Sequence, residues 1–157
     1  MAIYVVDASV VVQYAITQQY TSAAKNLISQ MYKGSRLCIP EFCLLECTNV
    51  LWKAVRFDDL AIADASQIIT ELLHLPFQVE PVAPLLPNAL QIGLTYQLAV
   101  YDSLYVALAQ QLDVPLISVD ERQVRAAIAH LSDGAGGFGH FEDAETGAGS
   151  VAGVAGI

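Results

Sequence analysis

The sequence has few of the features that mark secreted, disordered or membrane proteins. Only three of its 157 residues are cysteine, too few for a disulfide framework, and no basic segment precedes the first apolar run. No apolar run reaches the length of about 18 residues that a membrane-spanning helix needs. Charged residues make up 15% of the chain and hydrophobic residues 55%, which excludes disorder for most of it. We therefore expect one cytoplasmic domain without a membrane segment.

Basic residues are also scarce, since seven Lys and Arg stand against 16 Asp and Glu, for a formal net charge of −9. Proteins that bind nucleic acid through their own positive field are usually basic, so this balance alone argues against such binding. Residues 132–157 hold four acids and no base, which leaves −5 on residues 1–131. A divalent cation held by several acids would cancel much of that charge. The alternative is that the acidity only confers solubility.

Short apolar segments alternate with helical patterns in the first 131 residues. We expect strands at 3–6, 37–39, 77–82 and 115–119, and helices at 8–16, 21–33, 41–56, 59–75, 86–98, 102–112 and 121–131. This alternation predicts a parallel sheet covered by helices on both faces.

The composition changes at residue 132, after which eight glycines fall within 26 residues. Within this stretch, His140-Phe141-Glu142-Asp143 is the segment that suggests a short edge strand. We therefore predict a domain over 1–131 and a flexible, acidic, Gly/Ala-rich tail over 132–157.

Three aspartates occupy the beginnings of predicted helices. Asp7 ends the first strand, Asp120 ends the fourth, and Asp102 follows the irregular joint 99–101. Ligands of open α/β sheets bind beyond the carboxyl ends of the strands, so Asp7 and Asp120 lie at the edge where chemistry is expected. Each aspartate could equally be a helix N-cap, and Gln123 stands three residues after Asp120 as in a capping box.

Glu46 cannot be explained as a helix N-cap, because it lies inside the predicted helix 41–56 among apolar neighbours. Asn49 and Lys53 follow it at helical spacing, so the three side chains form one polar stripe. Carboxylate oxygens are the ligands that Mg²⁺ and Mn²⁺ prefer. Three or four converging acids would create such a site, although spacing alone does not establish that they converge.

Cysteine and aromatic residues near Glu46 have simpler interpretations. Cys43 and Cys47 lie one helical turn apart, which suits two zinc ligands, but no nearby histidine completes a four-ligand site. Both are therefore interpreted as buried cysteines. Trp52 is interpreted as a core residue, and Tyr101 and Tyr105 as core or interface residues rather than base-stacking ones.

Four segments, taken together and in order, resemble the PIN-domain ribonucleases, and in particular the toxin subunits of VapBC-type toxin–antitoxin pairs. They are Asp7-Ala8-Ser9, Pro40-Glu41 with Glu46 and Asn49-Val50-Leu51, Tyr101 to Ala109, and Pro115 to Arg122. The likeness spans about residues 2–131. It implies an α/β fold, a PIN-like α/β/α sandwich with a central parallel sheet of about four to five strands.

The resemblance also implies which residues act. Asp7, Glu46 and Asp102 match the core catalytic and metal-binding carboxylates of the family, and Asp120 matches a more variable fourth one. The supporting residues implied are Ser9, Asn49 and Ser118, the last standing where threonine is common. An enzyme of this kind is an endoribonuclease that hydrolyses RNA phosphodiester bonds with Mg²⁺ or Mn²⁺.

Lys53, Arg56 and Arg122 are our candidates for contacting RNA phosphates. For Arg56 the alternative is an interaction of its charge with the carboxyl end of its own helix. The resemblance implies an antitoxin protein as partner, and the high apolar content predicts a homodimer.

Two other functions compete with the ribonuclease. A non-catalytic PIN-fold interaction module would keep the fold without the activity. A receiver-like module would use Asp7 as a phosphorylated nucleophile, but the sequence has no second aspartate two residues later and no suitably placed lysine after a late strand.

Overall fold

Helices and strands alternate along the chain as the sequence predicts. The computed structural model describes residues 2–131, 138–140 and 153–155. Its strands are β1 (Ile3–Val6), β2 (Arg36–Pro40), β3 (Gln78–Glu80), β4 (Leu116–Ile117), β5 (Phe138–His140) and β6 (Gly153–Ala155). Its α-helices are α1 (Ala8–Ala15), α2 (Thr21–Ser29), α3 (Phe42–Phe57), α4 (Ile62–His74), α5 (Leu86–Tyr96), α6 (Val100–Leu112) and α7 (Glu121–Leu131). Two 3₁₀ turns, Gln30–Lys33 and Ala83–Leu85, extend α2 and precede α5.

The strands form a single sheet in the order β3-β2-β1-β4-β6-β5. The first four strands are parallel, which confirms the predicted α/β fold and its central parallel sheet. The strands β6 and β5 add antiparallel pairs beside β4. Both come from the stretch predicted as a tail. The edge strand suggested at 140–143 shares His140 with β5, whereas β6 was not predicted. Residues 141–143 of the suggested edge strand lie outside the described residues, and the domain boundary at 131 stays a prediction.

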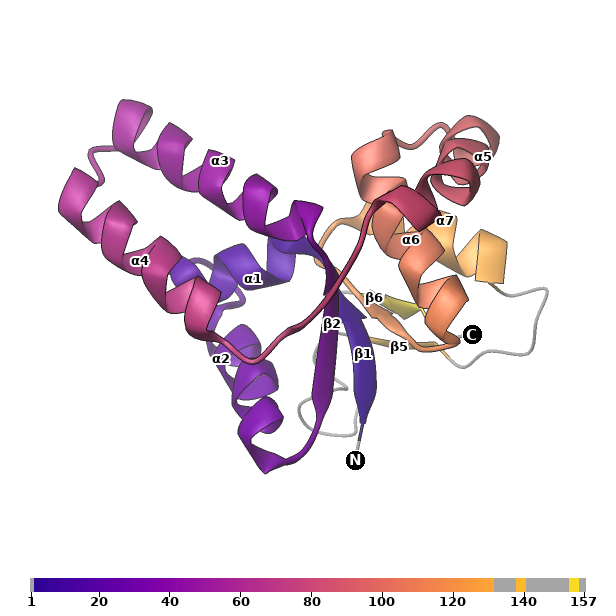
Figure 1. Ribbon diagram of the computed structural model, residues 1–157, viewed down its shortest axis with the longest axis horizontal. Coiled ribbons are helices and arrows are strands. Elements are labelled where there is room, and N and C mark those ends of the chain that lie inside the picture. The colour runs from indigo at the N-terminus through magenta and orange to yellow at the C-terminus, as the bar shows by residue number, and fades with distance from the viewer. Residues whose placement is uncertain (1, 132–137, 141–152, 156–157) are drawn as a thin grey trace.

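Helices enclose the parallel strands on both sides. Figure 1 shows α1 to α4 on one side of β1 and β2 and α5 to α7 on the other. The central strand residues Val5, Leu37, Ile39, Leu116 and Ile117 are all fully buried. Burial of both faces explains why these strands are continuous apolar runs rather than alternating ones.

Side chains of α3 divide between the core and the surface. Cys43 and Cys47 are buried free cysteines, as the sequence predicts. Trp52, predicted to be in the core, is 55% exposed, so that prediction is wrong. Its indole ring instead contacts two neighbours near the end of the same helix, the Phe57 ring edge-on at 6.2 Å between centroids and the Arg56 guanidinium.

The strand order places a binding edge beside β1. The strands β2 and β3 lie on one side of β1, and β4 lies on the other side. The order in which successive strands are added to the sheet therefore reverses between β1 and β4. Val6 of β1 is in register with Ile117 of β4, which sets the next residues, Asp7 and Ser118, side by side at the carboxyl end of the sheet. Open α/β sheets bind ligands at such a reversal point.

The start of α6 differs from the predicted one. Helix α5 ends at Tyr96 and is followed by its C-cap Gln97, which has a left-handed conformation with φ of 53°. Helix α6 begins at Val100 with Ala99 as its N-cap. Asp102 therefore lies within the first turn and is not the cap, which leaves its carboxylate available for other contacts. Among the described residues, no helix is long and apolar enough to cross a membrane.

Candidate functional site

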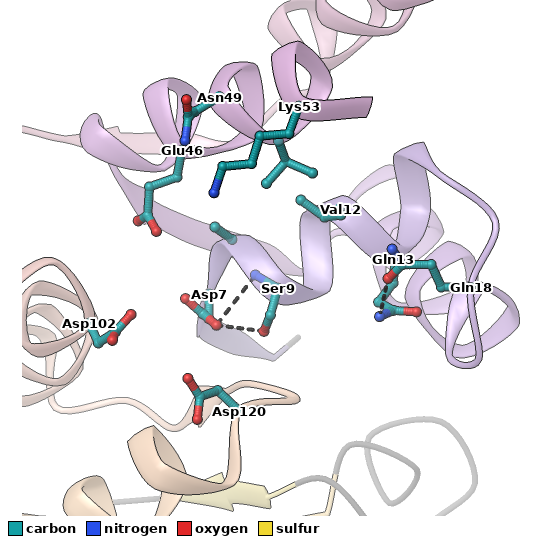
Figure 2. Close-up of a pocket in the computed structure, with 12 residues that line it drawn as sticks. Asp7, Ser9, Val12, Gln13, Gln18, Glu46, Asn49, Lys53, Asp102 and Asp120 are labelled. Atoms are coloured by element: carbon teal, nitrogen blue, oxygen red, sulfur yellow. Dashed lines mark hydrogen bonds between the residues drawn. The ribbon is translucent and has the colours of Figure 1, made fainter. Parts of the chain in front are cut away.

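Four carboxylates from separate parts of the chain line one pocket of about 470 Å³. Asp7 follows β1, Glu46 lies on α3, Asp102 on α6, and Asp120 precedes α7. Figure 2 shows all four side chains directed toward a common space. The other lining residues are Ala8, Ser9, Val12, Gln13, Gln18, Asn49, Val50 and Lys53. The structure thus brings together the acids that the sequence could only place on separate elements.

Asp7 is the buried floor of this pocket, with 4% of its surface exposed. Its Oδ2 accepts hydrogen bonds from the Ser9 backbone N–H at 3.3 Å, the Ser9 hydroxyl at 2.5 Å and the Ser118 hydroxyl at 3.0 Å. The N–H contact makes Asp7 the N-cap of α1, so the cap interpretation is correct here. Because all three of these bonds converge on Oδ2, Oδ1 is left facing the pocket.

The two serines join the loops that carry Asp7 and Asp120. The Ser9 hydroxyl accepts from the Val119 backbone N–H at 3.2 Å, and the Ser118 hydroxyl accepts from the Asp120 N–H at 2.9 Å. Each hydroxyl therefore binds Asp7 and the β4–α7 loop at once. The supporting positions implied by the resemblance, Ser9 and Ser118, hold two acids in fixed relation.

Asp120 caps α7 but does not form the capping box. Its Oδ1 accepts from the backbone N–H groups of Arg122 at 2.9 Å and Gln123 at 3.4 Å. The Gln123 side chain points elsewhere, and its Nε2 donates to the backbone carbonyl of Asp102 at 2.9 Å. Gln123 is fully buried, so it ties the first turn of α6 to α7 and fixes where Asp102 stands.

Glu46 is held by a residue that sequence reasoning assigned only to packing. Tyr105 is fully buried, and its hydroxyl donates to Glu46 Oε1 at 2.6 Å. Tyr105 lies three residues after Asp102 on α6, so both side chains lie on neighbouring parts of one helix face. The three-residue spacing of Asp102 and Tyr105 is visible in the sequence. No neighbouring residue, however, indicates that the Tyr105 hydroxyl would bind Glu46, which lies 59 positions earlier.

Burial and mutual repulsion oppose ionisation of these acids. Burial raises the pKa of Asp7 against the lowering effect of its serine hydrogen bonds. Burial, together with the charges of Asp7 and Asp102, raises the pKa of Glu46 to about 7, although its hydrogen bond from Tyr105 opposes the rise. Burial and the charges of Asp7 and Asp120 raise the pKa of Asp102 to about 6, with Arg122 opposing. Clustered carboxylates with raised pKa values mark a functional site more often than a structural one.

The donor set fits a hard divalent cation in chemical type and placement. Carboxylate oxygens face one pocket from four directions, and a cation among them would relieve the repulsion that raises their pKa values. In the described part of the chain, no three Asp, Glu, His or Cys side chains lie close enough together to hold a metal ion as they stand. Binding of a metal ion would therefore require the side chains to move so that the carboxylate oxygens lie closer together.

The predicted cationic residues occupy three different places. Lys53 lines the pocket, and Figure 2 shows its ammonium group directed toward the acids. Arg122 lies beside the pocket, where it interacts electrostatically with Asp102. Arg56 is not among the lining residues, and its guanidinium lies over the rings of Trp52 and Phe57, 6.0 and 5.7 Å from their centroids.

Comparison with known proteins identifies the family. Residues 4–129 match the PIN domain. The chain belongs to the PIN-domain family. It is 29% identical over 120 residues to ribonuclease VapC3 of Pyrobaculum aerophilum, covering 75% of this chain and 89% of that protein. It is also 29% identical over 118 residues to ribonuclease VapC12 of Mycobacterium tuberculosis, covering 75% of this chain and 87% of that one.

A solved structure agrees with this assignment. PAE2754 from Pyrobaculum aerophilum superimposes with a TM-score of 0.65 at 25% identity, over 80% of this chain and 79% of that one. The PIN-domain family and the α/β/α sandwich predicted from the four sequence segments are therefore confirmed.

The raised pKa values predict how stability depends on pH in the presence of a chelator. Glu46 keeps its proton up to about pH 7 and Asp102 up to about pH 6 in the folded state, whereas both release it near pH 4 when unfolded. The folded state therefore binds more protons across this window, so raising the pH favours unfolding. We expect the free energy of unfolding in urea to fall as the pH rises from about 4 to about 7 and to level off above that.

Both groups are only half-buried, so solvent screening limits the effect to on the order of 1 kcal/mol. Glu46→Gln should flatten the decrease, while Glu71→Gln on α4, outside the pocket, should leave it unchanged. A Glu46→Gln variant with the same pH slope as wild type would contradict the account.

The Tyr105 hydroxyl should control how well the pocket binds a cation. Tyr105→Phe removes the hydrogen bond that orients Glu46, and the loss of such a partner typically weakens metal binding 10- to 100-fold. We expect that loss for Mn²⁺ in isothermal titration calorimetry. Tyr96→Phe is the matched control, because its hydroxyl bonds to His130 Nδ1 at 3.4 Å outside the pocket. Equal Mn²⁺ affinities in the two variants would show that Tyr105 only packs.

Proposed function

We propose that this PIN-domain chain is an endoribonuclease that hydrolyses RNA phosphodiester bonds with Mg²⁺ or Mn²⁺ and acts as the toxin of a toxin–antitoxin pair. The observation that carries the proposal is the meeting of four carboxylates in one pocket, at the reversal point of the sheet. Relatives named ribonucleases VapC3 and VapC12 support the choice of RNA as substrate. An RNA substrate and free cysteines support a cytoplasmic location.

Each acid has a distinct part in this proposal. Asp7, Glu46 and Asp102 would hold the cation, directly or through water, and Asp120 would hold a second ion or orient the attacking water. A bound divalent cation supplies charge neutralisation at the phosphate and a more acidic water. Asp7 offers Oδ1 because Oδ2 is engaged by serines, and Glu46 offers Oε2 because Oε1 accepts from Tyr105.

Basic side chains around the pocket would bind the phosphates of the RNA backbone. Lys53 would bind a non-bridging phosphate oxygen, and its position in the lining of the same pocket as the acids supports this role. Arg122 flanks the opposite acids, Asp102 and Asp120. Arg56 would touch RNA only beyond the pocket. Asn49 lies beside Glu46 in the pocket lining and would bond substrate or water.

Cleavage assays on purified chain test the proposal directly. With Mg²⁺ or Mn²⁺ we expect cleavage of structured RNAs that leaves a 5′-phosphate and a 3′-hydroxyl, and no cleavage in EDTA. Asp7→Asn and Asp102→Asn should each reduce the rate by about 100-fold or more, because they remove metal ligands. Asp64→Asn, an exposed position on α4, controls for the loss of one charge.

The negative outcomes separate the alternatives. Mn²⁺ binding without cleavage of any RNA in a broad set would favour the non-catalytic interaction module. Cleavage that persists in EDTA would contradict the metal-dependent mechanism.

Two protein partners belong to the proposal: an antitoxin and a second copy of the chain. Leu86, Leu90 and Leu94 lie at four-residue spacing on α5 and are 45, 54 and 75% exposed. An apolar stripe of this kind on a helix suits packing against another copy.

The homodimer is tested by sedimentation velocity. We expect wild type to sediment as a dimer and Leu90→Glu as a monomer, because a charge would be buried in the shared stripe. Leu73→Glu, at a 60% exposed leucine on α4, should remain dimeric. A monomeric wild type at micromolar concentration would contradict the proposal.

A further inference from the structure

A second cavity, of about 340 Å³, lies beside the carboxylate pocket on the side of α5 and α7. Five described residues line it: Tyr96, Leu98, Arg122, Arg125 and Ala126. Two of the five are arginines and none is acidic, although the chain has only seven basic residues and a net charge of −9. The cavity is therefore a local concentration of positive charge in an acidic protein.

The two guanidinium groups have most of their hydrogen-bonding capacity left. Arg122 and Arg125 lie three residues apart on α7, so their side chains share one face of the helix. Arg122 donates to the Gln97 carbonyl at 3.4 Å and Arg125 Nε to the Glu121 carbonyl at 3.4 Å. Both contacts are long, and each guanidinium carries five donors. The remaining donors can bind an oxyanion in the bidentate manner typical of arginine and phosphate.

The cavity adjoins the carboxylate pocket through Arg122. Its backbone N–H donates to Asp120 Oδ1, and its side chain interacts with the charge of Asp102. Both aspartates line the first pocket, whereas Lys53 on α3 lines that pocket from another side. Figure 2 shows Lys53 and Asp120 at opposite borders of the space between the acids.

We propose that this cavity is a subsite for the RNA backbone next to the scissile bond. This rests on the proposed ribonuclease function. Arg122 and Arg125 bind the phosphate one or two nucleotides away from the cleaved one, and the partly buried ring of Tyr96 forms the wall beside the ribose or base. The strand then runs from Lys53, across the acids, to the arginine pair. Cations at both ends of the path let an acidic protein hold an anionic chain over carboxylates.

The test measures RNA binding rather than cleavage. A fluorescein-labelled single-stranded RNA of 12 nucleotides is titrated with full-length protein in Ca²⁺, over a series of KCl concentrations, and its integrity is checked on a gel. The variant is Arg125→Gln, which leaves Arg122 and the acids in place. The matched control is Arg36→Gln, which removes the same charge from an exposed residue at the amino end of β2, at the opposite edge of the sheet.

We expect Arg125→Gln to raise the dissociation constant about 3- to 10-fold at 0.1 M salt and to reduce the salt slope by about 0.7, the value for one phosphate contact on a single strand. Arg36→Gln should match wild type in slope. Equal slopes for Arg125→Gln and Arg36→Gln, with wild type binding RNA, would overturn the subsite while leaving the ribonuclease proposal intact. A wild type that binds no RNA at any salt would overturn both.

Discussion

The burial of the Asp7 carboxylate at the end of the central strand is the constraint on which the site depends. A carboxylate out of water is costly unless it is hydrogen-bonded. Here that need is met by Ser9 and Ser118, both bonded to Oδ2. The same hydroxyls accept backbone N–H groups of the β4–α7 loop. Satisfying one buried acid thus fixes the position of another, Asp120.

A similar logic applies to the other acids, each of which depends on a buried polar partner from a different element. Tyr105 on α6 holds Glu46 on α3, and Gln123 on α7 holds the backbone of Asp102 on α6. The first bond connects the two helical layers across the carboxyl edge of the sheet, and the second fixes α6 and α7 within one layer. Packing alone would bring α3, α6 and α7 together, but these hydrogen bonds determine which atoms face the pocket. What results is a group of acids whose repulsion a divalent cation would relieve.

Much of this arrangement could be predicted from the sequence because its signals are local. Asp7 and Asp120 stop apolar runs, and parallel strands bring their carboxyl ends to one edge. Glu46 stands out as a charge within an apolar helical pattern. The roles of Tyr105 and Gln123 could not be found in this way, since their partners lie 59 and 21 positions away. The start of α6 could not be predicted because the left-handed residue between the two helices is Gln97 rather than a glycine. The strand β6 could not be predicted because its short, glycine-rich sequence forms a strand only through pairing with β4 and β5.

The central claim is that the acids of β1, α3 and α6 serve one shared cation, and an anomalous diffraction experiment on crystals grown with Mn²⁺ tests it most directly. The account predicts a manganese peak in the pocket, within coordination distance of carboxylate oxygens from Asp7 and at least one of Glu46 and Asp102, with Tyr105 still bonded to Glu46. A pocket without manganese at millimolar concentration, or manganese bound only elsewhere on the molecule, would contradict it.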